Sequence, residues 1–86
     1  MYEIKFFPSS IKTLSLIDKT LSKRIINKIN WLAENIENIN LLSLKSNLTG
    51  FYKLRIGDWR VMYDVDSINK IVMICKIGLR KNIYKL

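Results

Sequence analysis

The spacing of the apolar residues changes once along this 86-residue chain, and the change constrains the fold more than any other feature. From residue 14 to residue 36, apolar side chains recur at intervals of three and four, which is typical of a helix with one buried face. These residues are Leu14, Ile17, Leu21, Ile25, Ile29, Leu32 and Ile36. From residue 51 onward, apolar and polar side chains alternate, as in half-buried strands. Helices followed by a separate run of strands predict a fold of the α+β class.

The first half of the chain begins with a short alternating segment. Residues 2–7 predict a strand that ends at Pro8, because proline has no N–H to donate to a strand ladder. Ser9 and Ser10 are the candidate N-caps of a following helix. Residues 18–20 predict a break in the helical pattern, so the helical region is expected to be a hairpin of two helices.

The second half is expected to form most of the sheet. Residues 35–47 are rich in asparagine and serine and predict a linker. Three strands are then expected, at residues 51–56, 59–65 and 71–77. Together with the N-terminal strand they give the order β-α-α-β-β-β, with a three-strand antiparallel meander in one sheet. The length allows one domain, over residues 1–86.

Composition excludes several classes of protein. The chain has no histidine and a single cysteine, Cys75, so it lacks the commonest general acid–base residue and a cysteine-built zinc site. Its seven carboxylates show no pair that spacing brings together, so acid–base catalysis by carboxylates has little support. We expect no metal and no cofactor. No apolar run approaches the ~20 residues of a membrane helix, so a cytoplasmic protein without a membrane partner is expected.

The charge indicates the kind of partner. Fifteen basic and seven acidic residues give a net charge of +8. Residues 1–44 hold six basic and four acidic residues, a net +2, whereas residues 45–86 hold nine and three, a net +6. A strongly basic domain favours an anionic partner such as nucleic acid. The alternative is a compositional bias toward Ile, Lys and Asn, which explains the arginines less well.

Pairing across the predicted hairpin brings basic residues together. Gly57 and Asp58 suit a type II′ turn, which places Arg55 opposite Arg60 on the face away from the apolar side chains. Lys53 lies on the same face. Like charges directly opposite one another destabilise a sheet, so an outward-facing arginine pair favours a bound anion. The alternative is a solvated face on which salt, Asp58 or Asp64 balances the charge.

A second basic group follows the last strand. Gly78 is expected to allow a tight bend before a short tail over residues 79–86. In one interpretation the tail only keeps the protein soluble. In the other it is a mobile arm that binds the same anion as the hairpin, with guanidinium on phosphate and aromatic ring on base, as in RNA recognition. The residues of this arm are Arg80, Lys81, Tyr84 and Lys85.

Five other side chains are interpreted as structural. Trp31 and Trp59 are expected to be core aromatic residues, and Met62 and Met73 to fill the core. Cys75 lies in an apolar strand, so we expect a small buried side chain rather than a nucleophile.

Two segments carry a resemblance to a known family. Residues 48–63, which include the run LRIGDWRVMY, and residues 77–84, which read IGLRKNIY, resemble the signatures of the RelE/ParE toxin superfamily. The resemblance implies the RelE-like fold and a toxin of a type II toxin–antitoxin pair, held inactive by a cognate antitoxin protein. RelE-like members enter the ribosomal A site and cleave mRNA there without a metal, by attack of a ribose 2′-hydroxyl on the adjacent phosphate.

The resemblance also implies roles for individual residues. Lys53 matches a lysine that helps to activate the nucleophile. Arg60 matches the arginine that stabilises the transition-state phosphate, and Arg80 matches one that stabilises this charge or assists the leaving oxygen. Tyr84 resembles the terminal aromatic residue that stacks on the nucleotide, and Arg55 matches an arginine that we assign to phosphate contact.

The resemblance leaves a second activity open. ParE-like members share the fold but bind DNA gyrase and trap it on DNA, usually without the ribonuclease residues. Phe51 stands where some RelE members have a second lysine, and Leu79 stands where many relatives have histidine. An inactive relative that only binds its antitoxin is a third possibility. The presence of Lys53, Arg60, Arg80 and Tyr84 together favours RNA cleavage over gyrase inhibition.

Overall fold

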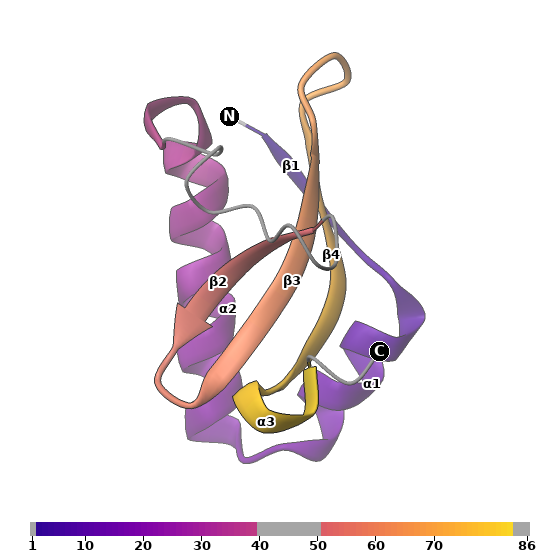
Figure 1. The fold of residues 1–86 in the computed structure, drawn as a ribbon, viewed down its shortest axis with the longest axis vertical. Helices are drawn as coiled ribbons and strands as arrows, with labels where there is room; N and C mark the ends of the chain where they lie inside the picture. The colour runs from indigo at the N-terminus through magenta and orange to yellow at the C-terminus, as the bar shows by residue number, and fades with distance from the viewer. Residues whose placement is uncertain (1, 40–50, 84–86) are drawn as a thin grey trace.

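A computed structural model of the protein describes residues 2–39 and 51–83. Tyr84 and Lys85 lie outside the described residues, as does most of the linker predicted at residues 35–47. The elements, drawn in Figure 1, are β1 (Glu3–Phe6), α1 (Pro8–Leu16), α2 (Lys19–Asn35), η1 (Ile36–Asn38), β2 (Tyr52–Ile56), β3 (Trp59–Asp66), β4 (Ile71–Leu79) and α3 (Arg80–Ile83). The predicted α+β class and the order of strands and long helices are confirmed.

The four strands form one sheet in the order β1-β4-β3-β2. β2, β3 and β4 are antiparallel neighbours, as the predicted meander requires. β1 pairs parallel with β4, because the chain crosses through the helical hairpin before it returns to the sheet. β2 therefore lies at one edge of the described sheet.

The break between the two long helices lies where it was predicted. The Asp18 carboxylate accepts hydrogen bonds from the N–H groups of Thr20 (3.0 Å) and Leu21 (3.3 Å), so Asp18 caps α2. The prediction of a serine N-cap on α1 is wrong. Pro8 begins that helix without a side-chain cap, and the buried Ser10 hydroxyl instead donates to the Ile74 carbonyl of β4 (3.2 Å).

The main core lies between the helical hairpin and one face of the sheet. Ile25, Ile29 and Leu32 of α2 are almost fully buried there, as the helical pattern predicted. From the sheet, Leu54, Ile56, Val61, Tyr63, Val72, Ile74 and Ile77 point into the same core. Trp59 packs against it, but the prediction for Trp31 is wrong, because 44% of that side chain is exposed.

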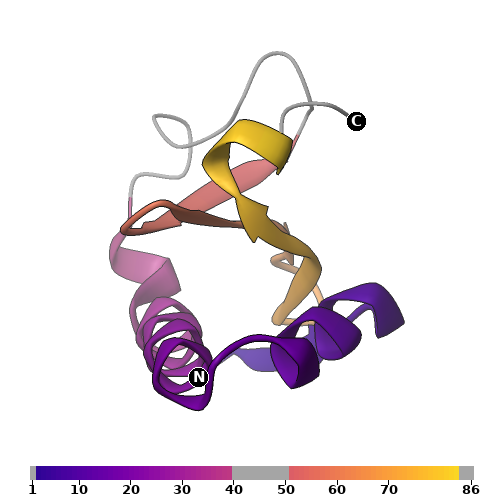
Figure 2. The same cartoon turned by 90° about the horizontal axis from the view of Figure 1, so that it is seen from below.

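The opposite face of the sheet is partly covered by α3. Figure 2 shows α3 on one side of the sheet, with α1 and α2 on the other. Ile83 of α3 and Met62 of β3 are both buried on this second side. The prediction of a mobile arm is therefore wrong for residues 79–83, since Leu79 ends β4 and the next four residues form a helical turn. No helix in the described ranges is long and apolar enough to cross a membrane.

Candidate anion-binding site

The hairpin between β2 and β3 has the predicted register. Gly57 has φ +57°, while Asp58 is not in the left-handed region, which fits a turn with glycine first. Arg55 pairs with Arg60, and Lys53 pairs with Met62. The basic residues of β2 and β3 therefore share the face of the sheet on which α3 lies.

The third strand extends these pairs into two rows. One row is Lys53–Met62–Lys76, and the other is Arg55–Arg60–Gly78. Lys76 of β4 was missed from the sequence, because a register shift between Met62 and Tyr63 changes which residues of β4 face each side. We define the candidate site as the cations around these rows: Lys53, Arg55, Arg60, Lys76, Arg80 and Lys81.

Arg60 is buried rather than outward-facing. Only 7% of the residue is exposed, and its Nη1 donates hydrogen bonds to the carbonyls of Gly57 (2.8 Å) and Trp59 (2.8 Å). The guanidinium is thus fixed by the backbone of its own hairpin, and no described residue accepts a hydrogen bond from its Nε or Nη2. The idea that Asp58 or Asp64 balances an arginine finds no support, because the one ion pair among the described residues joins Lys70 to Glu37 (3.5 Å).

Gly78 leaves space beside Arg60. The two residues are direct partners across β3 and β4, so their side-chain positions lie on the same face. A Cβ placed at Gly78 would meet no described heavy atom within 4 Å, and its φ is not in the left-handed region. The predicted bend at Gly78 is therefore wrong. Its missing side chain instead leaves open space on the face of the sheet that it shares with Arg60, and we call this space the Gly78 hollow.

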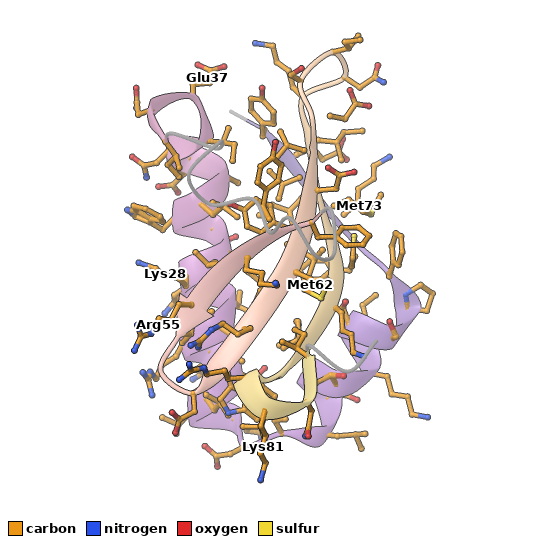
Figure 3. All side chains as sticks on the ribbon, in the orientation of Figure 1. Lys28, Glu37, Arg55, Met62, Met73 and Lys81 are labelled. Carbon is orange, nitrogen blue, oxygen red and sulfur yellow. The ribbon has the colours of Figure 1, made fainter. Side chains whose placement is uncertain are left out.

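α3 brings two further cations to the end of the hairpin. The Arg80 N–H donates to the Asp58 carbonyl (2.8 Å), which holds the start of α3 against the β2–β3 turn. Arg80 and Lys81 are exposed and line a hollow of about 320 Å³ together with Asp58 and Leu79. Arg55 and Met62 lie on the β2–β3 hairpin in Figure 3, and Lys81 projects from α3 beyond the end of this hairpin.

A fourth arginine reaches the same turn from the helical half. The Arg24 Nη2 atom of α2 lies 3.9 Å from the position of a Cβ at Gly57. Arg24 was not among the predicted site residues, although Arg24, Lys28 and Trp31 have the i, i+4, i+7 spacing of one helix face. All four arginines of the chain therefore approach the two-residue turn at Gly57 and Asp58.

The remaining reactive groups offer no alternative centre. Cys75 is half-buried rather than buried, and desolvation, followed by the charge of Asp64, raises the pKa of its thiol, which disfavours a nucleophilic thiolate. Burial, followed by the neighbouring Tyr52, raises the pKa of Tyr63 to about 12. Within residues 2–39 and 51–83, no three acidic or cysteine side chains gather as metal ligands would.

Comparison with known proteins identifies the family. Residues 4–84 match the family described as the ParE toxin of the type II toxin–antitoxin system parDE. Because the match spans almost the whole chain, the protein belongs to this family and to the RelE/ParE toxin superfamily that its sequence resembles. It is a toxin of a type II toxin–antitoxin system. No curated protein matches the chain in sequence.

Solved structures confirm the RelE-like fold. The chain is similar to the toxin–antitoxin complex RelBE of E. coli, with a TM-score of 0.77 and 17% identity over 92% of this chain and 96% of that one, which shows the fold alone. The archaeal RelE–RelB complex from Pyrococcus horikoshii gives 0.71 and 26%, over 94% and 97%. The YoeB–YefM toxin–antitoxin complex from Staphylococcus aureus gives 0.60 and 28%, over 88% and 93%.

Proposed function

We propose that this toxin is a metal-independent endoribonuclease that cleaves mRNA in the ribosomal A site. The observation that carries the proposal is Arg60, a guanidinium fixed by two backbone carbonyls, whose cross-strand partners are the cation Arg55 and the open position Gly78. A rigid cation suits a phosphate that gains charge during a reaction, because a preorganised donor needs no reorganisation at that moment. The resemblance to RelE-like toxins supplies the substrate.

The reaction is a transesterification within the RNA. The ribose 2′-oxygen forms a bond to phosphorus, and the bond from phosphorus to the 5′-oxygen breaks, which leaves a 2′,3′-cyclic phosphate and a 5′-hydroxyl. We assign Lys53, in its neutral amine form, as the base that takes the proton from the 2′-hydroxyl. Arg60 and Arg80 stabilise the pentavalent phosphorane, in which the negative charge on the equatorial oxygens is greatest.

Lys76 completes this assignment. The position two residues before Lys53 is Phe51, so strand β2 lacks the second lysine of some RelE members. Lys76 lies in the same cross-strand row as Lys53, with Met62 between them. We assign its ammonium as the acid that gives a proton to the departing 5′-oxygen, so that the proton balance closes without a histidine.

The toxin's partner is expected to be a protein antitoxin. The similar solved structures of E. coli, P. horikoshii and S. aureus are toxin–antitoxin complexes. An acidic antitoxin segment that covers the candidate site would neutralise its cations and keep the toxin inactive.

Gyrase inhibition is the second candidate function, and the family match favours it. The matching family is described by the ParE toxin of parDE. The resemblance to ParE-like members implies an inhibitor that binds gyrase without cleaving nucleic acid. The two functions differ in their need for Arg60 and Arg80 as reactive groups. A gyrase inhibitor requires a protein-binding surface, not an anion site of fixed geometry.

The test is mRNA cleavage in a purified translation system, mapped by primer extension with and without ribosomes. The wild-type protein is compared with Arg60→Ala, Arg80→Ala and a charge-matched control, Lys12→Ala, on the exposed side of α1. We expect cuts only in translated message, reduced about 100-fold or more in the two arginine variants and unchanged in the control. An intact message together with loss of supercoiling in a gyrase assay would reject the ribonuclease and support the gyrase inhibitor.

A further inference from the structure

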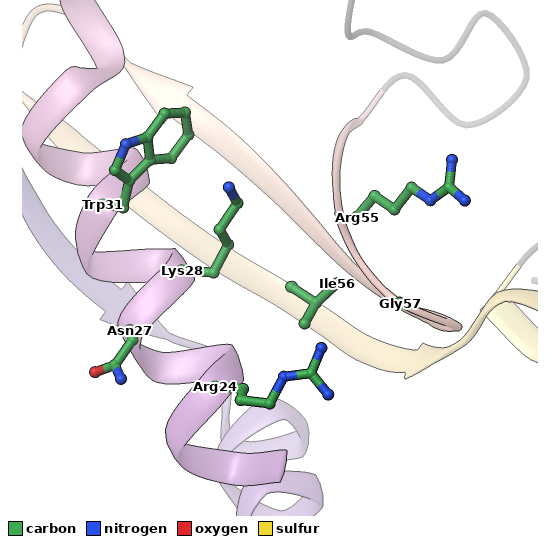
Figure 4. A pocket seen from close by; sticks show the side chains of 7 residues that line it. All are labelled: Arg24, Asn27, Lys28, Trp31, Arg55, Ile56 and Gly57. Atoms are coloured by element: carbon green, nitrogen blue, oxygen red, sulfur yellow. The ribbon is translucent and has the colours of Figure 1, made fainter. Parts of the chain in front are cut away.

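A second basic surface lies on the other side of the edge strand β2. It is a groove of about 500 Å³ between α2 and β2, shown in Figure 4. Its described lining residues are Arg24, Asn27, Lys28, Trp31, Arg55, Ile56 and Gly57. We call it the α2–β2 groove. The proposed catalytic residues Lys53, Arg60, Lys76 and Arg80 are not among these lining residues, so the groove is distinct from the catalytic part of the candidate site.

The α2–β2 groove is positively charged without a described counter-charge. Arg24 and Lys28 project from α2 toward β2, whereas the Arg55 guanidinium extends from β2 away from α2 (Figure 4). No carboxylate belongs to the described lining, and all three cations are exposed. The Lys28 Nζ lies 4.2 Å from the ring centroid of Trp31, whose indole is 44% exposed. Three cations in the lining of one groove, one of them over an accessible aromatic ring, are a combination that binds phosphate and a base together.

The groove is continuous with the candidate site through the β2–β3 turn. Arg24 approaches Gly57 from the groove side, and Arg60 donates to the Gly57 carbonyl from within the hairpin. Arg55, the cross-strand partner of Arg60, lines the groove as well. Cations thus lie on both sides of the β2–β3 turn, with Arg24 on the groove side and Arg60 within the hairpin.

We propose that the α2–β2 groove binds the sugar–phosphate backbone of single-stranded RNA, next to the segment held in the candidate site. This inference rests on the proposed ribonuclease function, whose substrate it extends beyond the cleaved phosphate. The exposed Trp31 ring beside Lys28 favours RNA over an acidic peptide, because a base stacks on the ring whereas a carboxylate side chain uses only the cations. Arg24, Lys28 and Arg55 contact phosphates, and Trp31 stacks on a base.

The first measurement is binding of a labelled 2′-O-methyl RNA of about ten nucleotides to the full chain by fluorescence anisotropy. This probe has no free 2′-hydroxyl, so binding is measured apart from cleavage. Arg24→Ala and Lys28→Ala are each expected to weaken binding at least about fivefold and to lower the slope of log Kd against log salt by about 0.7. Lys23→Ala is the matched control, because Lys23 is exposed on the same helix and outside the groove lining. It is expected to bind as the wild type does.

A second measurement locates the RNA at the indole. Titration with the same RNA is expected to quench the tryptophan fluorescence of the wild type, and Trp31→Phe is expected to remove most of this quenching. Poly-L-glutamate is the acidic-polypeptide comparison. If Arg24→Ala and Lys28→Ala weaken poly-L-glutamate binding as much as RNA binding, the groove is an unspecific basic surface and the proposal is overturned.

The outcomes separate this inference from the proposed function. If the wild type cleaves message but Arg24→Ala and Lys28→Ala bind RNA as tightly as Lys23→Ala, the groove proposal fails and the ribonuclease stands. If the wild type cleaves no message while both groove variants lose RNA binding and Trp31 is quenched, the ribonuclease fails and RNA binding in the groove stands.

Discussion

Arg60 has a structural role as well as a proposed catalytic one. Its Nη1 satisfies the carbonyls of Gly57 and Trp59 at the end of the β2–β3 hairpin. Arg80, by contrast, is exposed, and it is the backbone N–H of this residue, not its side chain, that bonds to Asp58. The two arginines proposed to act on the same phosphate should therefore differ in their contribution to stability.

This difference predicts the stability of the two alanine variants. Arg60→Ala is expected to lower the free energy of unfolding by about 2 kcal/mol, because it removes the partner of two carbonyls at the turn. Arg80→Ala is expected to change it by less than about 0.5 kcal/mol, as at other exposed positions. Urea unfolding followed by circular dichroism measures both. Equal free energies of unfolding for the two variants would mean that the hydrogen bonds from Arg60 to the backbone do not stabilise the fold.

Tyr63 has a buried hydroxyl without a hydrogen-bond partner among the described residues. Its pKa is raised to about 12, chiefly by burial and then by Tyr52, from the ordinary value near 10. Burial favours the neutral phenol, so the stability linked to this group is fully present below pH ~10 and is lost as the pH rises through about 12.

Tyr63→Phe is therefore expected to stabilise the fold. Removal of an unsatisfied buried hydroxyl should raise the free energy of unfolding by about 1 kcal/mol at neutral pH. The variant should also lose less stability than the wild type between pH 10 and 12, as measured by urea unfolding at each pH. A destabilised variant with an unchanged alkaline profile would show that the hydroxyl has a partner in solution.

β4 contributes the open position at Gly78 to the candidate site, whereas most of the site's cations come from β2, β3 and α3. Gly78 is the cross-strand partner of Arg60, and nothing described lies within 4 Å of where its Cβ would be. Gly57, in contrast, has φ +57°, a conformation that costs most residues about 1 kcal/mol or more. Gly78 is thus expected to matter for the space of the site, and Gly57 for the backbone conformation of the turn.

The pair Gly78→Ala and Gly57→Ala tests this difference. Gly78→Ala is expected to leave the free energy of unfolding unchanged or raised by up to about 1 kcal/mol, because a strand interior tolerates alanine better than glycine. It should nevertheless lower cleavage by about tenfold or more, since the methyl group displaces a phosphate that must lie close to Arg60. Gly57→Ala is expected to destabilise the hairpin by about 1 kcal/mol. Full cleavage by Gly78→Ala would exclude the hollow as the phosphate position.

The hairpin could be predicted from the sequence because its register depends on a local turn. Gly57 and Asp58 fix every pair between β2 and β3, so Arg55 opposite Arg60 followed directly. The partners of β4 could not be derived in this way, because the shift between Met62 and Tyr63 depends on packing between distant segments. Lys76 was missed for this reason. The burial of Arg60 was missed because the alternation of apolar and polar residues does not show that its side chain bonds to the backbone of the turn.

The arginines of the chain converge although they are distant in sequence. Arg24 comes from the helical half, two arginines come from the hairpin and Arg80 comes from α3. Charge counts by halves of the chain placed the basic surface in residues 45–86 and so omitted Arg24 and Lys28. Only the packing of α2 against the edge of β2 shows that the basic surface includes the helix. The α+β class, by contrast, depended only on the change of hydrophobic period and was predicted from the sequence.

The central claim is the transesterification at the candidate site, and the most direct measurement is the chemistry of the cut ends. Message cleaved by the wild-type toxin on purified ribosomes is isolated, and the termini at the cut are identified by mass spectrometry. We predict a 2′,3′-cyclic phosphate on the upstream fragment and a 5′-hydroxyl on the downstream fragment. A 3′-hydroxyl with a 5′-phosphate would contradict attack by the 2′-oxygen, and uncut message would contradict the ribonuclease itself.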